Sequence, residues 1–399
     1  MIKIRKSRGL RTAATALAGV AVLAAAACSG SSTSSGSSSS VGIDTPPSVS
    51  SSSLASDASS VSSPTGGSDT SVPSTSAGLS NESSFAPQSG DYGKGKTATL
   101  VSSQSVNDNG VMQDFVSGFK AATAAAGMKS NIVVLTDPST YQSTLESVST
   151  RSDLVFTTFP PMIQALEAVA PNHPKVDYVL LDAQVAKPIN NVQELFFREN
   201  QSSYLAGIIA GEMTKTKKVG FLGALKQDVI DRYLVGYWAG VKSVSPSIQV
   251  CYAYVGSLND PALGKQFANT MYGQGVDIIH AATAGTEVGV YQAAEGDQKY
   301  LIGADVDIRP FAPKYGLTAA GPDFAGAAKV TVGQFAADKF KTGLQTYGLA
   351  DGAVRLLPYN DDLVPQKVQA DVAKAKQAII DGKITVPDDK SVGSVKNCA

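Results

Sequence analysis

The sequence predicts an α/β fold with two lobes of similar size, each built around a parallel sheet. Two observations support this fold class. From about residue 96 onward, short runs rich in Val, Ile and Leu alternate with segments of helical period. The order of strands and helices found before residue 200 then repeats after it. Such alternation is typical of parallel strands joined by crossover helices, and ligands bind such sheets at the carboxyl ends of the strands.

The expected elements form two series. In the first, we expect strands at 97–102, 131–136, 153–159 and 176–183, with helices at 112–127, 141–150 and 161–170. The second has strands at 218–224, 248–256, 276–285 and 299–307, with helices at 231–246, 262–275 and 288–298. Later segments are expected to return to both lobes: a strand and a helix in 317–343, a strand in 352–360 and a helix in 365–383. Several chain crossings would then form a hinge.

Residues 1–27 have the pattern of an export signal. Five basic residues between Lys3 and Arg11 precede an apolar stretch, residues 13–27, that is too short for a permanent membrane helix. The stretch ends in VLAAAACSG, which resembles a bacterial lipoprotein signal whose cysteine, here Cys28, is acylated after cleavage. One acyl chain binds a membrane only marginally, so a stable anchor requires multiple acylation, palmitate included. The alternative is ordinary signal-peptidase cleavage after an Ala.

Residues 28–92 are expected to form a disordered tether. They consist mainly of Ser with Gly, Thr and Pro and have almost no large apolar residue, so they cannot bury enough surface to offset the entropy of ordering. A random coil of roughly 60 residues spans about 40 Å. The tether would let a folded head clear a cell wall or reach a membrane partner, unless it is only a spacer.

The cysteines leave two possibilities open. Besides Cys28, the chain has only Cys251 and Cys398. Because disulfides persist outside the cytoplasm, these two either form a bridge or are both buried free thiols.

Charge and motif content disfavour two function classes. The 33 Lys and Arg residues nearly balance the 34 Asp and Glu residues, so no basic field favours nucleic acid as a partner. The sequence has no HExxH, no GxSxG and no cluster of Cys and His, and its two histidines are His173 and His280. We therefore expect no catalytic site, no metal and no cofactor.

Two carboxylates, Asp305 and Asp307, stand where the apolar run YLIGADVD ends. Side chains alternate along a strand, so the two should point to opposite sides and are poorly placed to share a metal. Asp307 is expected to be structural. Asp305 is expected to hold ligand hydroxyls, because a carboxylate offers only acceptors and can receive two adjacent hydroxyls at once. A helix cap or an ion pair is the alternative for Asp305.

Several ordered motifs carry a resemblance to a known family. FRENQSSYLAGIIAG (197–211), GYWAGVK (236–242), the segment 254–294 and LIGADVD (301–307) together resemble the basic membrane protein family, also called the PnrA-like lipoproteins. The resemblance covers roughly residues 96–390. It implies a type I periplasmic-binding-protein fold with two doubly wound parallel-sheet lobes joined by a hinge. It also implies delivery of a solute, a purine nucleoside in several relatives, to an ABC permease and its ATPase, with the acidic residue of GADVD on the ribose hydroxyls.

The first lobe departs from the family pattern. Where relatives read approximately D-S-G-G-x-N-D-K-S-F-N-Q, this chain has SSQSVNDNGVMQ. Asn107 and Asp108 match and are expected to line the first-lobe rim of the cleft. Ser102 replaces the first Asp, Val111 the stacking Phe and Met112 an Asn. A lost aromatic platform removes roughly 1 to 3 kcal/mol of stacking per base, and Met112 can offer only a soft contact, so these changes argue against purine binding.

Other cleft positions differ as well. Gln164 stands where relatives tend to have an Asp, and is expected to contact the polar edge of the ligand. Pro322 replaces a Lys near the ligand, and Leu258 stands where an aromatic residue is frequent. Phe159 or Tyr291 is the alternative source of a stacking surface.

Glycines that follow strands form a further group of candidates. Gly223 and Gly285 come just after apolar runs, where a missing Cβ lets the backbone approach a ligand and helix N-termini can hold polar oxygens. Tight strand-to-helix turns are the alternative explanation of both.

The expected domain boundaries follow from these patterns. Lobe 1 comprises 93–215 with part of 310–345, lobe 2 comprises 216–309 with part of 346–390, and 391–399 is a tail. The expected function is capture of a small polar solute, a purine nucleoside or related compound, on the outer face of the cell membrane. A ligand-sensing lipoprotein of the same fold, a binding protein for another solute such as a sugar, and a surface enzyme are the alternatives.

Overall fold

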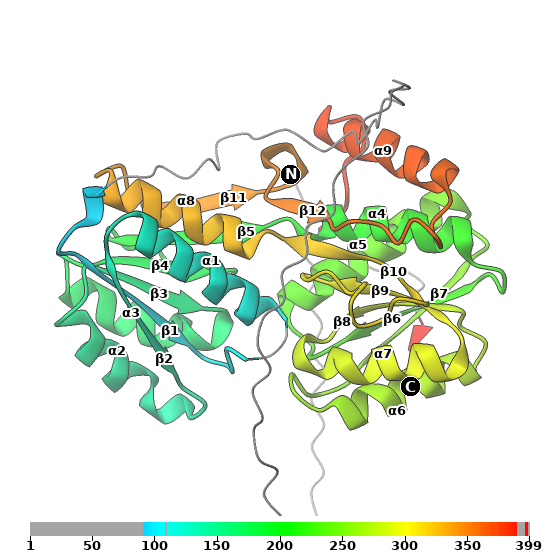
Figure 1. Ribbon diagram of the computed structural model, residues 1–399, viewed down its shortest axis with the longest axis horizontal. Helices are drawn as coiled ribbons and strands as arrows, with labels where there is room; N and C mark the ends of the chain where they lie inside the picture. Colours follow the sequence, from blue (N-terminus) through cyan, green and yellow to red (C-terminus); the bar gives the residue numbers. More distant parts are fainter. Residues whose placement is uncertain (1–90, 108–109, 389–395, 398–399) are drawn as a thin grey trace, which may run out of the picture. The chain divides into compact units, whose positions relative to one another are not determined.

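The described part of the chain contains two sheets, as the repeated series predicts (Figure 1). The computed structural model describes residues 91–107, 110–388 and 396–397, and these belong to one compact unit. The predicted signal, Cys28 and nearly all of the predicted tether lie outside the described residues. None of the helices in the described ranges combines the length and apolarity that a membrane crossing requires.

Lobe 1 is built on a six-stranded parallel sheet in the order β11-β5-β4-β3-β1-β2. Its strands are β1 (Thr97–Ser102), β2 (Lys129–Val134), β3 (Leu154–Thr158), β4 (Asp177–Leu181), β5 (Val192–Phe197) and β11 (Gly343–Tyr347). Helices cover both faces, with α1 (Val111–Ala125) and α8 (Phe324–Ala336) on one and α2 (Tyr141–Ser149) and α3 (Ile163–Val169) on the other (Figure 1).

The two faces of this sheet bury separate apolar cores, because successive strand residues point to opposite sides. Leu100 and Phe156 pack with α1 and α8, whereas Val101 packs with α2 and α3. Phe115 and Phe119, four residues apart on α1, are fully buried, and each contacts the Phe156 ring edge-on with ring centroids 5.5–5.6 Å apart. The alternating pattern therefore gives a doubly wound lobe.

Lobe 2 has a seven-stranded sheet in the order β12-β10-β9-β8-β6-β7-β13. Its strands are β6 (Lys218–Gly223), β7 (Gln249–Tyr254), β8 (Ile278–Ala282), β9 (Tyr300–Ala304), β10 (Gly316–Pro322), β12 (Val354–Leu356) and β13 (Lys396–Asn397). All pairs are parallel except β10 with β12, which is antiparallel. One face carries α4 (Glu199–Met213), α5 (Asp228–Val244) and α9 (Gln366–Ile380), the other α6 (Pro261–Gly273) and α7 (Glu287–Asp297) (Figure 1).

The lobe boundaries differ from those expected. Residues up to 215 were assigned to lobe 1, but α4 packs on α5 and therefore belongs to lobe 2. Of the segment 310–345, β10 joins the lobe 2 sheet while α8 and β11 join lobe 1. The strand β11 was not expected. The chain thus crosses between the lobes after β5, after β10 and after β11, which agrees with the expected multiple crossings.

The strand β13 brings the C-terminal end of the chain beside β7, with Lys396 in register with Cys251. Cys251 is 5% exposed and disulfide-bonded. Its predicted partner, Cys398, lies outside the described residues, so the pairing remains a prediction.

Glycines let α4 and α5 pack at backbone contact. A Cβ placed on Gly236 or Gly240 would overlap the main-chain oxygen of Asn200 or Tyr204, and one on Gly207 would overlap that of Tyr237. The helix α4 begins with Glu199 directly after the crossing from β5, and Arg232 lies in the first turns of α5, so the close packing of the two helices also fixes where these two residues lie.

We expect Gly240→Ala to lower the free energy of unfolding by about 1–3 kcal/mol, because the added methyl group forces the two helices apart. Urea denaturation would measure the change. Gly273→Ala is the matched control: nothing lies within 4 Å of its added Cβ, so it should be neutral or stabilising by up to about 1 kcal/mol. Equal stability of the two variants would contradict the packing argument.

Candidate functional site

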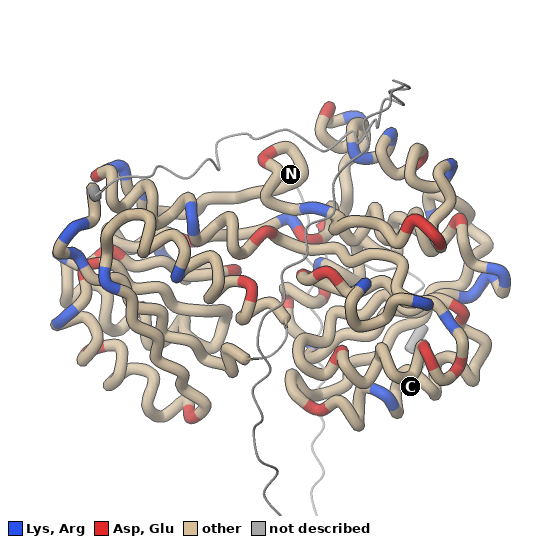
Figure 2. The backbone as a smooth tube through the Cα atoms, in the orientation of Figure 1, with Lys and Arg blue, Asp and Glu red and all other residues tan. Residues whose placement is uncertain are grey.

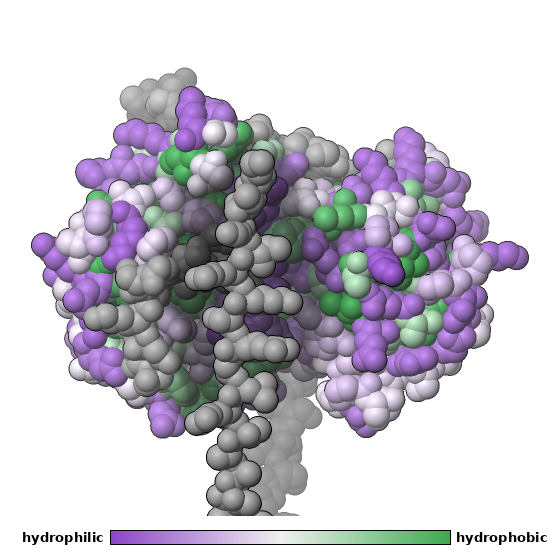
Figure 3. Space-filling model, turned by 180° about the vertical axis from the view of Figure 1, so that it is seen from behind, coloured by the Kyte–Doolittle hydropathy of each residue, from purple (hydrophilic) through white to green (hydrophobic). Residues whose placement is uncertain are grey.

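The surface of the described residues has no field of a single sign. Lys and Arg are interspersed with Asp and Glu over both lobes (Figure 2). The face shown in Figure 3 is predominantly hydrophilic, with apolar residues in separate small areas. A candidate site is therefore sought in a pocket and among buried charges.

A pocket lies between the lobes, at the carboxyl ends of β8 and β9 and the start of α1. Its cavity volume is about 20 Å³, which is room for about one water. Lobe 1 contributes Gly110 and Val111 to its wall. Lobe 2 contributes the β8–α7 residues Ala284, Glu287, Val288 and Tyr291, and the residues after β9, Ala304, Asp305, Val306 and Phe311.

Asp305 is held in the wall of this pocket by its neighbours. It has φ 66°, a left-handed conformation, and its Oδ1 accepts a hydrogen bond from the Tyr233 hydroxyl at 2.5 Å. Burial and the nearby Asp305 carboxylate raise the pKa of Tyr233 well above its usual value, so the tyrosine remains a donor. A Cβ on Gly321 would overlap Asp305 Oδ1, so the carboxylate occupies space that only a glycine leaves open.

Glu287, the first residue of α7, also faces the pocket. It is 4% exposed, and its Oε1 accepts the Ala304 N–H at 3.2 Å. Tyr291, one turn along the helix, is hydrogen-bonded to Glu287 and stacks on Phe311 with ring centroids 5.9 Å apart and planes at 16°. Burial, and then the neighbouring Asp305, raise the pKa of Glu287 well above its usual value.

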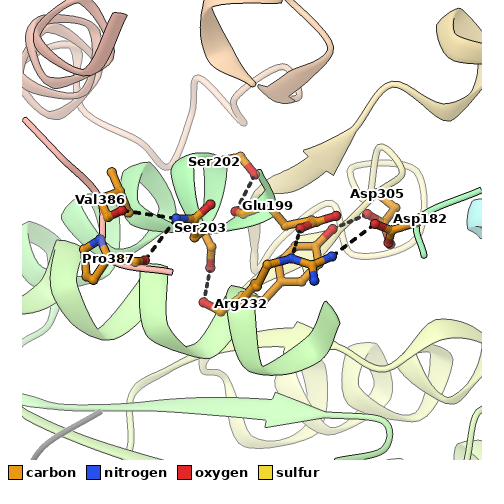
Figure 4. Close-up of polar contacts among 10 residues, drawn as sticks. Asp182, Glu199, Ser202, Ser203, Arg232, Asp305, Val386 and Pro387 are labelled. Atoms are coloured by element: carbon orange, nitrogen blue, oxygen red, sulfur yellow. Dashed lines mark hydrogen bonds and ion pairs between the residues drawn. The ribbon is translucent and has the colours of Figure 1, made fainter. Parts of the chain in front are cut away.

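A second acidic cluster joins the lobes through Arg232 of α5. Arg232 donates from Nε to Glu199 Oε2 at 2.7 Å and from its terminal NH2 to Asp182 Oδ1 at 3.1 Å (Figure 4). Asp182 follows β4 of lobe 1, whereas Glu199 opens α4 of lobe 2. The guanidinium also lies 4.3 Å from the ring centroid of Phe196, a cation–π geometry.

The charges of this cluster are shielded from water. The side chains of Asp182 and Glu199 are at most 1% exposed and that of Arg232 is 11% exposed. Burial, and then Glu199, raise the pKa of Asp182 well above its usual value, an effect that Arg232 opposes. The three groups therefore depend on one another to remain buried.

Among the predicted ligand residues, Asp305 lies at the pocket and the others within the described ranges do not line it. Ser102 is buried and donates to Gln104 O at 2.7 Å. Met112 is fully buried in the α1 core of lobe 1. Phe159 packs edge-on against Phe324, with centroids 6.3 Å apart.

The remaining predicted residues differ in exposure and surroundings. Asn107 and Gln164 are exposed and Leu258 is half-buried, and Asp108 lies outside the described residues. A Cβ on Gly223 would meet Ile230 and Tyr254, and one on Gly285 would meet Asn259. Both glycines therefore allow close packing within the protein, which agrees with the structural alternative to a ligand contact.

Both histidines have structural partners. His280 is fully buried in lobe 2 with Nδ1 3.1 Å from Ile302 O, and burial lowers its pKa to about 4. His173 contacts Glu146 at 2.7 Å. Asp307 pairs with Arg309, which confirms its expected structural role. Residues 91–107 and 110–388 contain no group of three or more His, Cys, Asp and Glu side chains arranged to hold a metal ion.

Sequence reasoning missed Glu287 and Phe311 at the pocket, and Asp182 and Arg232 in the cluster. The rule that ligands meet residues just after parallel strands would have pointed to Asp182 and Glu287. Arg232 lies within a helix, so its contact with Asp182 required the arrangement of the two lobes.

Two α/β lobes with a pocket at their strand ends are the architecture that two-lobed solute-binding proteins have. In fold, the chain is similar to an ABC transporter solute-binding protein from Aeropyrum pernix K1, with TM-score 0.68 and 21% identity over 74% of this chain and 94% of that one. It is also similar to one from Conexibacter woesei DSM 14684, with TM-score 0.61 and 21% identity over 73% of this chain and 99% of that one.

Residues 95–390 match the family model described as ABC transporter substrate-binding protein PnrA-like, and the chain belongs to that family. It is 34% identical to the ABC transporter nucleoside-binding protein BmpA of Lactococcus lactis subsp. cremoris over 75% of this chain and 92% of the relative. Basic membrane protein A2 of Borrelia garinii subsp. bavariensis is 30% identical over 75% of this chain and 92% of the relative. The family is that of substrate-binding proteins of ABC transporters, so a solute and a permease are the implied partners.

We expect Arg232→Met to lower the free energy of unfolding by about 3–5 kcal/mol, because it leaves two buried carboxylates without their cation. Buried acids with raised pKa values stabilise the folded state less as pH rises. The deficit should therefore be larger at about pH 8 than at about pH 5, measured by urea denaturation.

Arg309→Met is the matched control for this prediction. Its ion pair with Asp307 is 39% and 32% exposed, so its loss should cost less than about 1 kcal/mol. A deficit in Arg232→Met that did not change with pH would contradict the role assigned to the buried cluster.

Proposed function

We propose that the protein captures a small polar solute, a nucleoside or a related compound, between its lobes and delivers it to the permease of an ABC transporter. The observation that carries the proposal is the Asp305 carboxylate in the wall of the interlobe pocket, oriented by Tyr233. A carboxylate can accept hydrogen bonds from two adjacent hydroxyls, as on a ribose. The name of the relative BmpA, a nucleoside-binding protein, supports this solute class.

Aromatic surface for the base would come from lobe 2. Val111 stands at the position of the family's stacking Phe and lines the pocket, but a Val offers no stacking platform. Tyr291 and Phe311 line the pocket as a stacked pair, which supports the alternative in which Tyr291 supplies stacking. Asn107 and Asp108, just before Gly110, are proposed rim contacts from lobe 1, and Gln164 is a proposed contact with the ligand's polar edge.

Entry of a solute would require motion of the lobes. A cavity of about 20 Å³ holds about one water, far less than a nucleoside occupies. The chain crossings after β5, β10 and β11 are the segments that would bend as the lobes separate and close.

The N-terminal sequence is the basis for a proposed membrane anchor. We propose that Cys28 is acylated and that residues 28–92 tether the lobes to the outer face of the cell membrane. Metabolic labelling with palmitate, compared with Cys28→Ala, tests the anchor: label on the chain that is lost in the variant supports it, and secretion of an unlabelled chain contradicts it.

Isothermal titration calorimetry with adenosine, guanosine and inosine tests the solute class, with glucose and ribose as comparisons. We expect nucleoside binding that weakens about 10- to 100-fold in Asp305→Asn, because charge-assisted hydrogen bonds contribute roughly 1.5–3 kcal/mol. Asp307→Asn, which changes a neighbouring carboxylate outside the pocket, should bind as the wild type does.

The possible failures of this experiment are distinct. Binding of a sugar but of no nucleoside would reject the nucleoside class and keep the site. Unchanged nucleoside affinity in Asp305→Asn would reject the role of Asp305.

A further inference from the structure

Asp182, Glu199 and Arg232 form a cluster that crosses from one lobe to the other (Figure 4). Asp182 moves with lobe 1, because it follows β4 and its N–H donates to Leu195 O of β5 at 2.8 Å. Glu199 and Arg232 move with lobe 2, because α4 and α5 pack at backbone contact. The contacts of Asp182 with the other two side chains are therefore the ones that change when the lobes separate and close.

The closed arrangement places one cation against two acids. Arg232 lies 3.1 Å from Asp182 Oδ1 and 2.7 Å from Glu199 Oε2, and among the described residues it is the cation that pairs with these carboxylates. The carboxylate of Asp305, after β9, adds a third negative charge that acts on Asp182. The side chains of Asp182 and Glu199 are at most 1% exposed, so water screens their repulsion little.

One oxygen of the cluster has no donor within the part of the chain that the structure describes. This is Glu199 Oε1, which is buried. Asp182 is in hydrogen-bond contact with Glu199, yet two ionised carboxylates bring only acceptors to such a contact. A proton on Asp182 turns its carboxyl group into a donor to Glu199 and leaves Glu199 and Arg232 as a balanced pair. The pKa of Asp182, which burial and then Glu199 raise well above its usual value, supports this assignment.

Separation of the lobes removes both causes of the raised pKa. With the lobes apart, Asp182 faces water away from Glu199, where the pKa of an aspartate is about 4. A state in which an acid has the higher pKa is favoured as pH falls. The closed state therefore gains on the open state as pH falls from the raised pKa toward about 4, and below that value both states hold the proton and the gain is complete.

We propose that closure of the two lobes takes up one proton, which Asp182 holds against Glu199, so that the protein closes more readily in acid. This inference rests on the proposed closure of the lobes around a solute and adds a proton to that step. The groups that face Asp182 from other elements are Glu199 on α4, Arg232 on α5 and Asp305 after β9. Solute binding accordingly tightens as pH falls.

The first test needs no solute. Two dyes are attached through azide-bearing amino acids at the exposed positions Lys120 on α1 and Lys265 on α6, because Cys251 is disulfide-bonded and thiol labelling would disturb it. Single-molecule energy transfer then measures the ratio of closed to open molecules from about pH 5 to about pH 8. We expect this ratio to fall as pH rises, by up to about tenfold per pH unit.

Two variants isolate the cluster. Asp182→Asn has the shape of the protonated acid at every pH, so its ratio of closed to open molecules should not change with pH. Glu199→Gln leaves one acid with one cation, so Asp182 stays ionised and the pH dependence should again be lost. Asp307→Asn is the matched control: it changes an acid that is 32% exposed and lies outside the cluster, so it should keep the pH dependence of the wild type. Circular dichroism confirms that each variant is folded.

Proton uptake on solute binding gives a second readout that a packing role would not move. Calorimetric titration of adenosine in two buffers of different ionisation enthalpy should show uptake of up to about one proton by the wild type and less by Asp182→Asn.

The outcomes separate this inference from the proposed function. Closure that increases in acid in the wild type but not in Asp182→Asn would support the inference, whether or not a nucleoside binds. Energy transfer that does not change with pH, or a pH dependence that persists in Asp182→Asn, would overturn the inference and leave nucleoside binding intact. Nucleoside binding without proton uptake would count against the inference alone, and failure to bind any nucleoside would count against the solute class alone.

Discussion

The structure depends on how it neutralises the carboxylates that lie at the ends of its strands. Asp182 follows β4 and Asp305 follows β9, and Glu199 and Glu287 are the first residues of the helices α4 and α7. Asp182, Glu199 and Glu287 are buried and Asp305 is partly buried. Buried charges are tolerated only when they are paired or protonated, so each of the three needs a cation, a hydrogen-bond donor or a proton close by.

The helix α5 serves two of these needs with consecutive residues. Arg232 binds Asp182 and Glu199, and Tyr233 donates to Asp305. Because Asp182 belongs to lobe 1 and the other groups to lobe 2, the first contact also joins the lobes where the chain crosses between them. The glycines that seat α5 against α4 fix the helix that carries both residues, so packing and electrostatics support the same arrangement.

The carboxylates at the pocket and those of the Arg232 cluster have different kinds of partner in the described residues. In the cluster, a protein cation contacts both acids. At the pocket, Asp305 accepts a hydrogen bond from the Tyr233 hydroxyl and Glu287 accepts one from the Ala304 N–H. Of the residues that the structure describes, Gly110 and Val111 are the share of lobe 1 in this wall. Most of the described wall, including both carboxylates, comes from lobe 2.

The sequence by itself determined the alternation of strands and helices, the repeated lobe and the position of Asp305 just after a strand of the second series. These features are local or periodic: side-chain period distinguishes strand from helix, and Asp305 stands directly after an apolar run. Tertiary structure decided the rest. The place of α4 in lobe 2 depends on glycine contacts with α5 made 36 residues apart, as between Tyr204 and Gly240. The sequence motif predicted Met112 and Ser102 as ligand contacts, yet both side chains are buried. Glu287 and Asp305 line the same pocket because the strands before them, β8 and β9, are neighbours in the sheet. Such contacts join distant segments, and no local pattern records them.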